Sequence, residues 1–92
     1  MICSFQHRGL KRLYERGDES GIRPDLLDKV STILEHLDAA QSVQGMRLPA
    51  LRLHALKGDL RGYYAVTVKT NWRIIFRFAG GDVHDVKLVD YH

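Results

Sequence analysis

Five side chains of this 92-residue sequence could together cut RNA without a metal ion. In that reaction the 2′-hydroxyl attacks the adjacent phosphate, leaving a 2′,3′-cyclic phosphate and a free 5′-hydroxyl. The step needs a base, an acid and cations for the charge that grows on the phosphorane. Histidine titrates near neutrality, lysine and arginine stabilise phosphate charge, and aromatic rings stack bases. The residues that supply these groups are His54, Lys57, Arg73, Tyr91 and His92.

Taken singly, each of these residues has an ordinary explanation. A lone strand histidine such as His54 is more often structural than catalytic, and Lys57 precedes Gly58 in a turn. Arg73 suits a solvated strand position, and the last two residues lie where chains often fray. The catalytic hypothesis therefore depends on whether the fold brings all five side chains to one place.

Composition and motifs argue against several other classes of protein. A chain of 92 residues with 45% hydrophobic and 27% charged residues is expected to form a single globular domain over residues 1–92. Short apolar runs and the lack of a signal-peptide pattern predict no membrane contact and a cytoplasmic location. The single cysteine, Cys3, cannot form an internal disulfide and is expected to fill the core. The sequence has no histidines spaced as in metal sites and no glycine-rich phosphate loop. We therefore expect no metal and no cofactor.

The first half of the sequence has the periodicity of helices. Residues 1–6 are typical of a short strand, and residues 8–16 place apolar side chains on one face of a helix that Gly17 can cap. Residues 24–40 carry a longer apolar stripe, with Pro24 suited to the first helical position. This second helix needs a surface on which to pack.

The second half of the sequence changes to the two-residue period of strands. The alternation predicts strands over 51–56, 63–69, 72–78 and 83–90, with turns at Lys57-Gly58-Asp59, Lys69-Thr70-Asn71 and Gly80-Gly81-Asp82. Two helices followed by a meander predict an α+β fold, in which two N-terminal helices pack on a small, mainly antiparallel twisted sheet.

The same alternation predicts which face each chemical group occupies. Trp72, Ile74 and the phenylalanines that follow should face the helices, so Arg73 and Arg77 should point to the other face. By the same rule His54 opposes Leu53, while His84 should point inward. His54, Arg73 and Tyr91 are therefore expected on one face of the sheet, away from the helices.

Charge is unevenly distributed along the sequence. Between Arg47 and Arg77 there are seven lysines and arginines and a single acid, Asp59. Such a basic segment suits a polyanionic partner such as nucleic acid, although a solvated basic surface explains it equally well.

Several short motifs resemble those of the HigB toxins, which belong to the RelE/ParE superfamily and are also called plasmid maintenance system killer proteins. The resemblance spans the whole chain and combines Leu56-Lys57-Gly58-Asp59, Gly62-Tyr63-Tyr64, Asn71-Trp72-Arg73-Ile74, Gly81-Asp82 and the terminal Val89-Asp90-Tyr91-His92. The combination is specific, whereas each piece alone is weak.

The resemblance implies a RelE-like microbial RNase fold and a toxin of a type II toxin–antitoxin system. Such a toxin cleaves messenger RNA in the A site of the ribosome, and a HigA-like helix-turn-helix antitoxin neutralises it. Operator DNA is then bound only through the antitoxin complex. By matching position, the resemblance carries an active site onto His54, Lys57, Arg73, Tyr91 and His92.

The resemblance identifies these five residues, and their roles are assigned from the chemistry of each side chain. Lys57 and Arg73 are expected to stabilise the phosphorane and Tyr91 to orient the phosphate or a base. His92 is assigned as general base and His54 as acid, although the two histidines can exchange roles. Further cations expected to hold messenger or ribosomal RNA are Arg52, Arg61 and Arg77.

Two other functions fit parts of the sequence. ParE-like relatives share the fold but inhibit DNA gyrase by binding it, a function that needs no paired histidines. A simple RNA- or ribosome-binding module needs only the basic face. Cleavage of programmed ribosomes discriminates among the three hypotheses.

Overall fold

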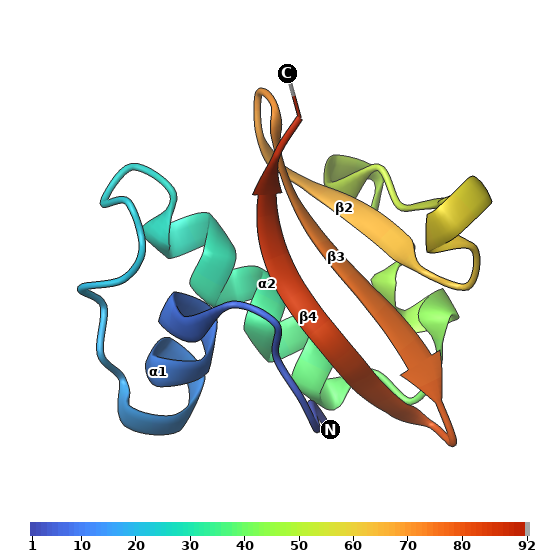
Figure 1. Cartoon of the computed structure of the whole chain (residues 1–92), viewed down its shortest axis with the longest axis horizontal. Helices are drawn as coiled ribbons and strands as arrows, with labels where there is room; N and C mark the ends of the chain where they lie inside the picture. The colour runs from blue at the N-terminus through green and yellow to red at the C-terminus, as the bar shows by residue number, and fades with distance from the viewer. Residues whose placement is uncertain (92) are drawn as a thin grey trace.

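The helices lie on one side of the molecule and a sheet lies on the other, as the computed structural model of the chain shows (Figure 1). The structure describes residues 1–91, so His92 lies outside the described residues. Within that range the chain runs through α1 (Arg8–Arg16), α2 (Leu27–Ala39), three short 3₁₀ turns, and strands β1 (His54–Ala55), β2 (Tyr64–Lys69), β3 (Trp72–Ala79) and β4 (Asp82–Asp90). The strands pair antiparallel in the order β1-β2-β3-β4, which confirms the predicted α+β fold.

Both predicted helices form, although the second begins late. Gly17 caps α1 in the left-handed conformation and donates its N–H to Leu13 O, as predicted. Helix α2 begins at Leu27 rather than near Pro24, because the N–H groups of Leu26 and Leu27 bond to carbonyls three residues back in a tight turn. None of the helices within residues 1–91 is both long and apolar enough to cross a membrane.

The core forms between α2 and one face of the sheet. The stripe on α2 buries Val30, Ile33 and Leu37 against the strands. On β3, Ile74 and Phe76 are fully buried in the same cluster, and Trp72 and Phe78 pack at its margin. The predicted inward face of β3 is therefore confirmed, and burial of these apolar groups holds the helices on that side.

The strand predicted over 51–56 is largely wrong. Residues Pro49–Leu51 instead form a 3₁₀ turn, and Arg52 has a φ of +50°, which turns the chain out of the extended conformation. As a result, only His54 and Ala55 pair with β2, opposite Ala65 and Tyr64.

Residues 1–6 form a short extended segment that pairs in parallel with β4. The N–H of Cys3 bonds to Val83 O at 2.7 Å, and the N–H of Gln6 bonds to Val86 O at 2.9 Å. Ile2 is buried, whereas Cys3 is exposed. The prediction that Cys3 fills the core is therefore wrong, since its neighbour takes the inward position.

A bulge changes the alternation of β4. Val83 and Val86 are both fully buried although they are three residues apart, and Asp85 between them has a φ of +57°. The pairing between β3 and β4 shifts at the same point, between Ile75 and Arg77. His84, predicted to point inward, is consequently placed opposite Arg77 and is half-buried.

Candidate active site

The face of the sheet turned away from the helices carries the sequence-predicted chemistry. Cross-strand pairing aligns His54 with Ala65, Ala65 with Ile75, and Ile75 with Lys87. One pleat along, Thr67 pairs with Arg73 and Arg73 with Val89. Residues two apart in a strand share a face, so these two rows belong to the same face. We call it the open face. His54 and Arg73 share this face, as the alternation predicts.

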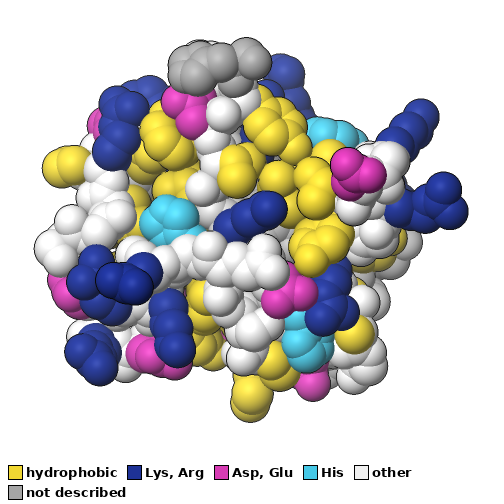
Figure 2. Space-filling view, viewed as in Figure 1, with side chains coloured by type: hydrophobic (Ala, Val, Ile, Leu, Met, Phe, Trp, Pro, Cys, Tyr) yellow, Lys and Arg dark blue, Asp and Glu magenta, His cyan; other side chains and the backbone are white. Residues whose placement is uncertain are grey.

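The floor of the open face is apolar. Ala65 is 0% exposed and Ile75 is 1% exposed, yet neither belongs to the core cluster on the helix side. Figure 2 shows apolar side chains gathered over strands β2, β3 and β4, with lysines and arginines among and around them. An apolar floor weakens solvent screening, so charges at its edge act more strongly on a bound phosphate.

His54 is exposed at the β1 edge of the open face. Its Nδ1 lies 3.3 Å from the carbonyl oxygen of Arg52. A carbonyl oxygen only accepts hydrogen bonds, so this contact requires the proton on Nδ1 and leaves Nε2 of the neutral ring unprotonated. Arg52 itself has a left-handed backbone conformation, two residues before His54.

Lys57 and Arg73 lie on different elements, Lys57 in the loop after β1 and Arg73 on β3. Lys57 is exposed and immediately precedes the 3₁₀ turn Gly58–Leu60. Arg73 is half-buried, and its Nη1 donates to Thr70 O at 2.6 Å and to Trp72 O at 3.1 Å. These bonds hold the guanidinium at the hairpin between β2 and β3, where Thr70 has a φ of +50°.

Tyr91 follows the last residue of β4 and is 41% exposed. Its N–H donates to Asn71 O at 2.8 Å, which places the backbone of Tyr91 beside the same hairpin, between β2 and β3 (Figure 1). The predicted catalytic residue His92 lies outside the described residues, so its place stays a prediction. Among the five predicted catalytic residues, the structure thus places Arg73 and Tyr91 at one hairpin and His54 on the same face.

The three cations predicted to hold RNA differ in their surroundings. Arg52 and Arg61 are exposed in the loops on either side of Lys57. Arg77 lies on β3, and its Nε donates to a carboxylate oxygen of Asp85 at 2.6 Å. That hydrogen bond holds the pKa of Asp85 below its usual value.

Asp85 is the centre of a polar cluster that sequence reasoning missed. Its carboxylate also accepts from Ser4 Oγ at 3.3 Å and from Tyr63 Oη at 3.4 Å, and its N–H donates to Ser4 Oγ at 2.9 Å. The cluster joins the N-terminal segment to β3, to β4 and to the residue that precedes β2. It depends on the bulge at Asp85, and an alternation of two cannot reveal a bulge.

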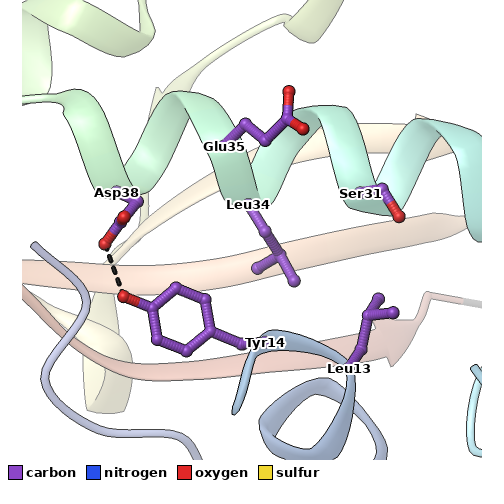
Figure 3. Close-up of a pocket in the computed structure, with 6 residues that line it drawn as sticks. All are labelled: Leu13, Tyr14, Ser31, Leu34, Glu35 and Asp38. Carbon is purple, nitrogen blue, oxygen red and sulfur yellow. Dashed lines mark hydrogen bonds between the residues drawn. The ribbon is translucent and has the colours of Figure 1, made fainter. Parts of the chain in front are cut away.

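A groove of about 280 Å³ lies between α1 and α2, away from the open face (Figure 3). Tyr14 Oη donates to Asp38 at 2.6 Å across it, and Asp38 also accepts from the N–H of Ile2 at 3.1 Å. This hydrogen bond raises the pKa of Tyr14 to about 12. The lining acids Glu35 and Asp38 make the groove unsuited to RNA.

Metal-ligating side chains do not cluster in the part of the chain that the structure describes. Within residues 1–91, no group of three or more histidines, cysteines or acids could hold a metal ion. The described side chains of the open face offer cations, an imidazole and a phenol. Those groups suit acid–base and electrostatic catalysis at a phosphate.

Comparison with known proteins shows which family the chain resembles. Residues 3–92 match the family described as the RelE-like toxin of the type II toxin–antitoxin system HigB. The chain is 41% identical to Endoribonuclease HigB of Proteus vulgaris over the full length of both, and 30% identical to Toxin HigB-1 of Vibrio cholerae over 83 residues, covering 88% of this chain and 87% of that one. It is similar in fold to YoeB in the heterotetrameric YoeB–YefM toxin–antitoxin complex of Staphylococcus aureus, with a TM-score of 0.63, 16% identity, and coverage of 100% and 98% of the two chains.

Proposed function

The chain belongs to the HigB-like family of RelE-like toxins, and from that membership we propose that it cuts messenger RNA in the A site of the ribosome. The chain is an endoribonuclease toxin of a toxin–antitoxin system, a function supported by its full-length similarity to a named endoribonuclease. The observation that carries the proposed mechanism is that His54 and Arg73 share the open face, with Tyr91 bonded beside the hairpin of Arg73.

The proposed reaction needs no metal ion. A base removes the proton of the 2′-hydroxyl, the 2′-oxygen bonds to phosphorus, and the bond from phosphorus to the 5′-oxygen breaks as an acid protonates that oxygen. Lys57 and Arg73 stabilise the phosphorane, since cations on a face with an apolar floor act most strongly where charge grows. Tyr91 orients the phosphate or stacks a base.

The two histidines divide the proton transfers. The contact between His54 Nδ1 and Arg52 O leaves Nε2 as a proton acceptor, which favours His54 as the base and His92 as the acid. This is the exchanged form of the assignment made from the sequence. Arg52 and Arg61 extend the basic surface along which RNA is held. Arg77 adds a positive charge to this surface while it stays paired with Asp85.

The proposed partners follow from the family. A toxin of this kind is neutralised by an antitoxin, and YoeB, which has the same fold, is seen in complex with YefM. For this chain we propose a HigA-like helix-turn-helix antitoxin, with operator DNA bound only through the complex. The proposed targets are messenger RNA and the small ribosomal subunit in the cytoplasm.

The test is cleavage of messenger RNA on ribosomes programmed with a defined A-site codon. Wild-type protein should yield fragments ending in a 2′,3′-cyclic phosphate in the presence of a metal chelator that leaves the ribosomes intact. His54→Ala and His92→Ala should each lose at least ~100-fold in single-turnover rate, as expected for loss of a general acid or base. His36→Ala, an exposed histidine on α2, is the matched control and should cut at the wild-type rate.

Two outcomes would contradict the proposal. Undiminished cutting by both active-site variants would remove the mechanism. Absence of cutting by the wild type, together with inhibition of DNA gyrase, would identify a ParE-like inhibitor instead.

A further inference from the structure

Lys87 extends the row of the open face that begins at His54. It pairs with Ile75 on β3, and its neighbours Val86 and Leu88 are both buried on the helix side. Lys87 must therefore point to the open face, where the two side chains between it and His54 are the buried Ala65 and Ile75. The row thus has a histidine at one end, a lysine at the other and an apolar floor between.

Unlike its neighbouring cations Arg73 and Arg77, Lys87 has no hydrogen-bond acceptor among residues 1–91. Arg73 donates to two backbone carbonyls and Arg77 is paired with Asp85. Lys87 is half-buried, and among residues 1–91 it makes neither a hydrogen bond nor an ion pair. A partly desolvated ammonium without an acceptor is unfavourable for folding, and a bound anion removes that cost.

The position of Lys87 relative to Arg73 indicates which anion fits. Arg73 pairs with Val89, so Lys87 is its diagonal neighbour on the same face. Diagonal neighbours lie roughly 7–8 Å apart, within reach of two long side chains. Two like charges so placed repel each other in the free protein, and phosphate groups on a single RNA strand supply the opposite charge to both.

We propose that Lys87 binds the messenger RNA phosphate next to the scissile one and so sets the path of the RNA from β1 toward β4. The inference rests on the proposed function for the identity of the scissile phosphate. Arg73 serves the reacting phosphate and Lys87 a neighbouring one, which makes Lys87 a positioning residue that does not take part in proton transfer.

The first experiment measures binding without cleavage. Ribosomes are programmed with messenger RNA carrying 2′-O-methyl groups in the A-site codon, which removes the nucleophile, and affinity is measured at several salt concentrations. Lys87→Met should weaken binding roughly fivefold at low salt, the upper end for an exposed charge pair. The slope of log affinity against log salt should fall by about 0.7, the value for one phosphate on a single strand.

Two further variants test whether charge is responsible. Lys87→Arg keeps the charge and should stay within about twofold of the wild type in affinity and keep its salt slope. Lys29→Met replaces a half-buried lysine of α2, on the opposite side of the sheet, and should change neither quantity. Thermal unfolding should give Lys87→Met a midpoint at or above the wild-type value, because the substitution relieves like-charge repulsion.

The second experiment locates the phosphate. A neutral methylphosphonate replaces the linkage on either side of the scissile one, and its effect is compared for wild-type and Lys87→Met proteins. The inference predicts that one of these linkages weakens wild-type binding but leaves the variant unchanged. If Lys87→Met weakens binding by the same factor with every messenger, the lysine contacts ribosomal RNA instead, and the inference is overturned.

The two proposals fail in different ways. Wild-type and Lys87→Met proteins with equal affinity and equal salt slope would overturn the inference even if the wild type cuts RNA. A wild type that binds with the predicted Lys87 dependence but never cuts unmodified messenger would instead overturn the proposed function.

Discussion

The backbone N–H of Tyr91 donates to the carbonyl oxygen of Asn71 over 2.8 Å, so Tyr91 is bonded to the hairpin that leads into Arg73. Arg73 in turn donates to the carbonyls of Thr70 and Trp72 in that hairpin. The backbone of Tyr91 and the guanidinium of Arg73 are thus both bonded to one backbone turn. A disturbance of this hairpin should affect both groups at once.

Replacing Arg73 should separate its two roles. Arg73→Ala should slow cleavage on programmed ribosomes by roughly 100- to 1,000-fold, the size of effect seen when one charge-stabilising donor is lost. It should also lower the free energy of unfolding by about 1 kcal/mol, because hydrogen bonds to the hairpin carbonyls disappear. Lys69→Ala, on the same hairpin, removes an exposed ion pair with Asp25 and should keep full activity. Wild-type rates for Arg73→Ala would exclude it from the site.

The cluster around Asp85 should make stability depend on acid pH. Arg77 lowers the pKa of Asp85, so the stabilisation is complete above the unfolded value of about 3.9 and is lost as pH falls through the lower folded value. Asp85→Asn should cost about 1–2 kcal/mol at pH 7, and the difference from wild type should shrink below about pH 4. Asparagine tolerates the φ of +57°, so the substitution tests the carboxylate and its hydrogen bonds without adding backbone strain.

Urea unfolding at pH 3 to 7 provides the measurement. Glu35→Gln, at an exposed position of α2, is the control and should change stability by less than about 0.5 kcal/mol at each pH. A constant gap between wild type and Asp85→Asn down to the lowest pH would contradict the assignment.

His7 should make the start of α1 sensitive to pH. Its Nδ1 accepts from the N–H of Leu10 at 3.1 Å, and burial lowers its pKa. Protonation removes the acceptor, so this stabilisation is complete above the unfolded value of 6.5 and is lost as pH falls through the lower folded value. His7→Asn keeps a capping oxygen that does not titrate.

The thermal midpoint of His7→Asn should therefore vary less between pH 7.5 and pH 5 than that of the wild type. His36→Asn, on the exposed surface of α2, serves as the control for a general histidine effect. Identical pH profiles for wild type and His7→Asn would show that the cap does not respond to protonation.

Gly9 should resist a substitution that normally favours helices. Exchanging glycine for alanine in a helix interior usually gains about 1 kcal/mol. In α1, however, a Cβ at Gly9 would lie 2.5 Å from the carbonyl oxygen of Gly21. Gly9→Ala should therefore lower the free energy of unfolding by roughly 1–3 kcal/mol, measured by urea titration. Lys11→Ala, exposed on the same helix, should be nearly neutral; a stabilised Gly9→Ala would mean that α1 shifts away easily.

The sequence prediction failed where the backbone leaves the regular strand conformation. The strand expected over 51–56 is cut short because Arg52 adopts a left-handed conformation beside the buried Leu51. The expected inward position of His84 fails because Asp85 bulges out and bonds to Ser4, Tyr63 and Arg77. Those partners come from distant parts of the chain, so a local pattern carries no sign of them.

The sequence by itself determined the features that depend on hydrophobic periodicity and on short motifs. Its periods of 3.6 and 2 specified the helices, the main strands and the outward direction of Arg73, because burial of one face enforces those periods residue by residue. Its motifs identified the family. Tertiary structure alone decided the bulge in β4, the hydrogen bond between Tyr91 and Asn71, and the place of Lys87 in the same cross-strand row as His54. The physical reason is that register and hydrogen-bond partners are set between strands, so they exist only once the strands have met.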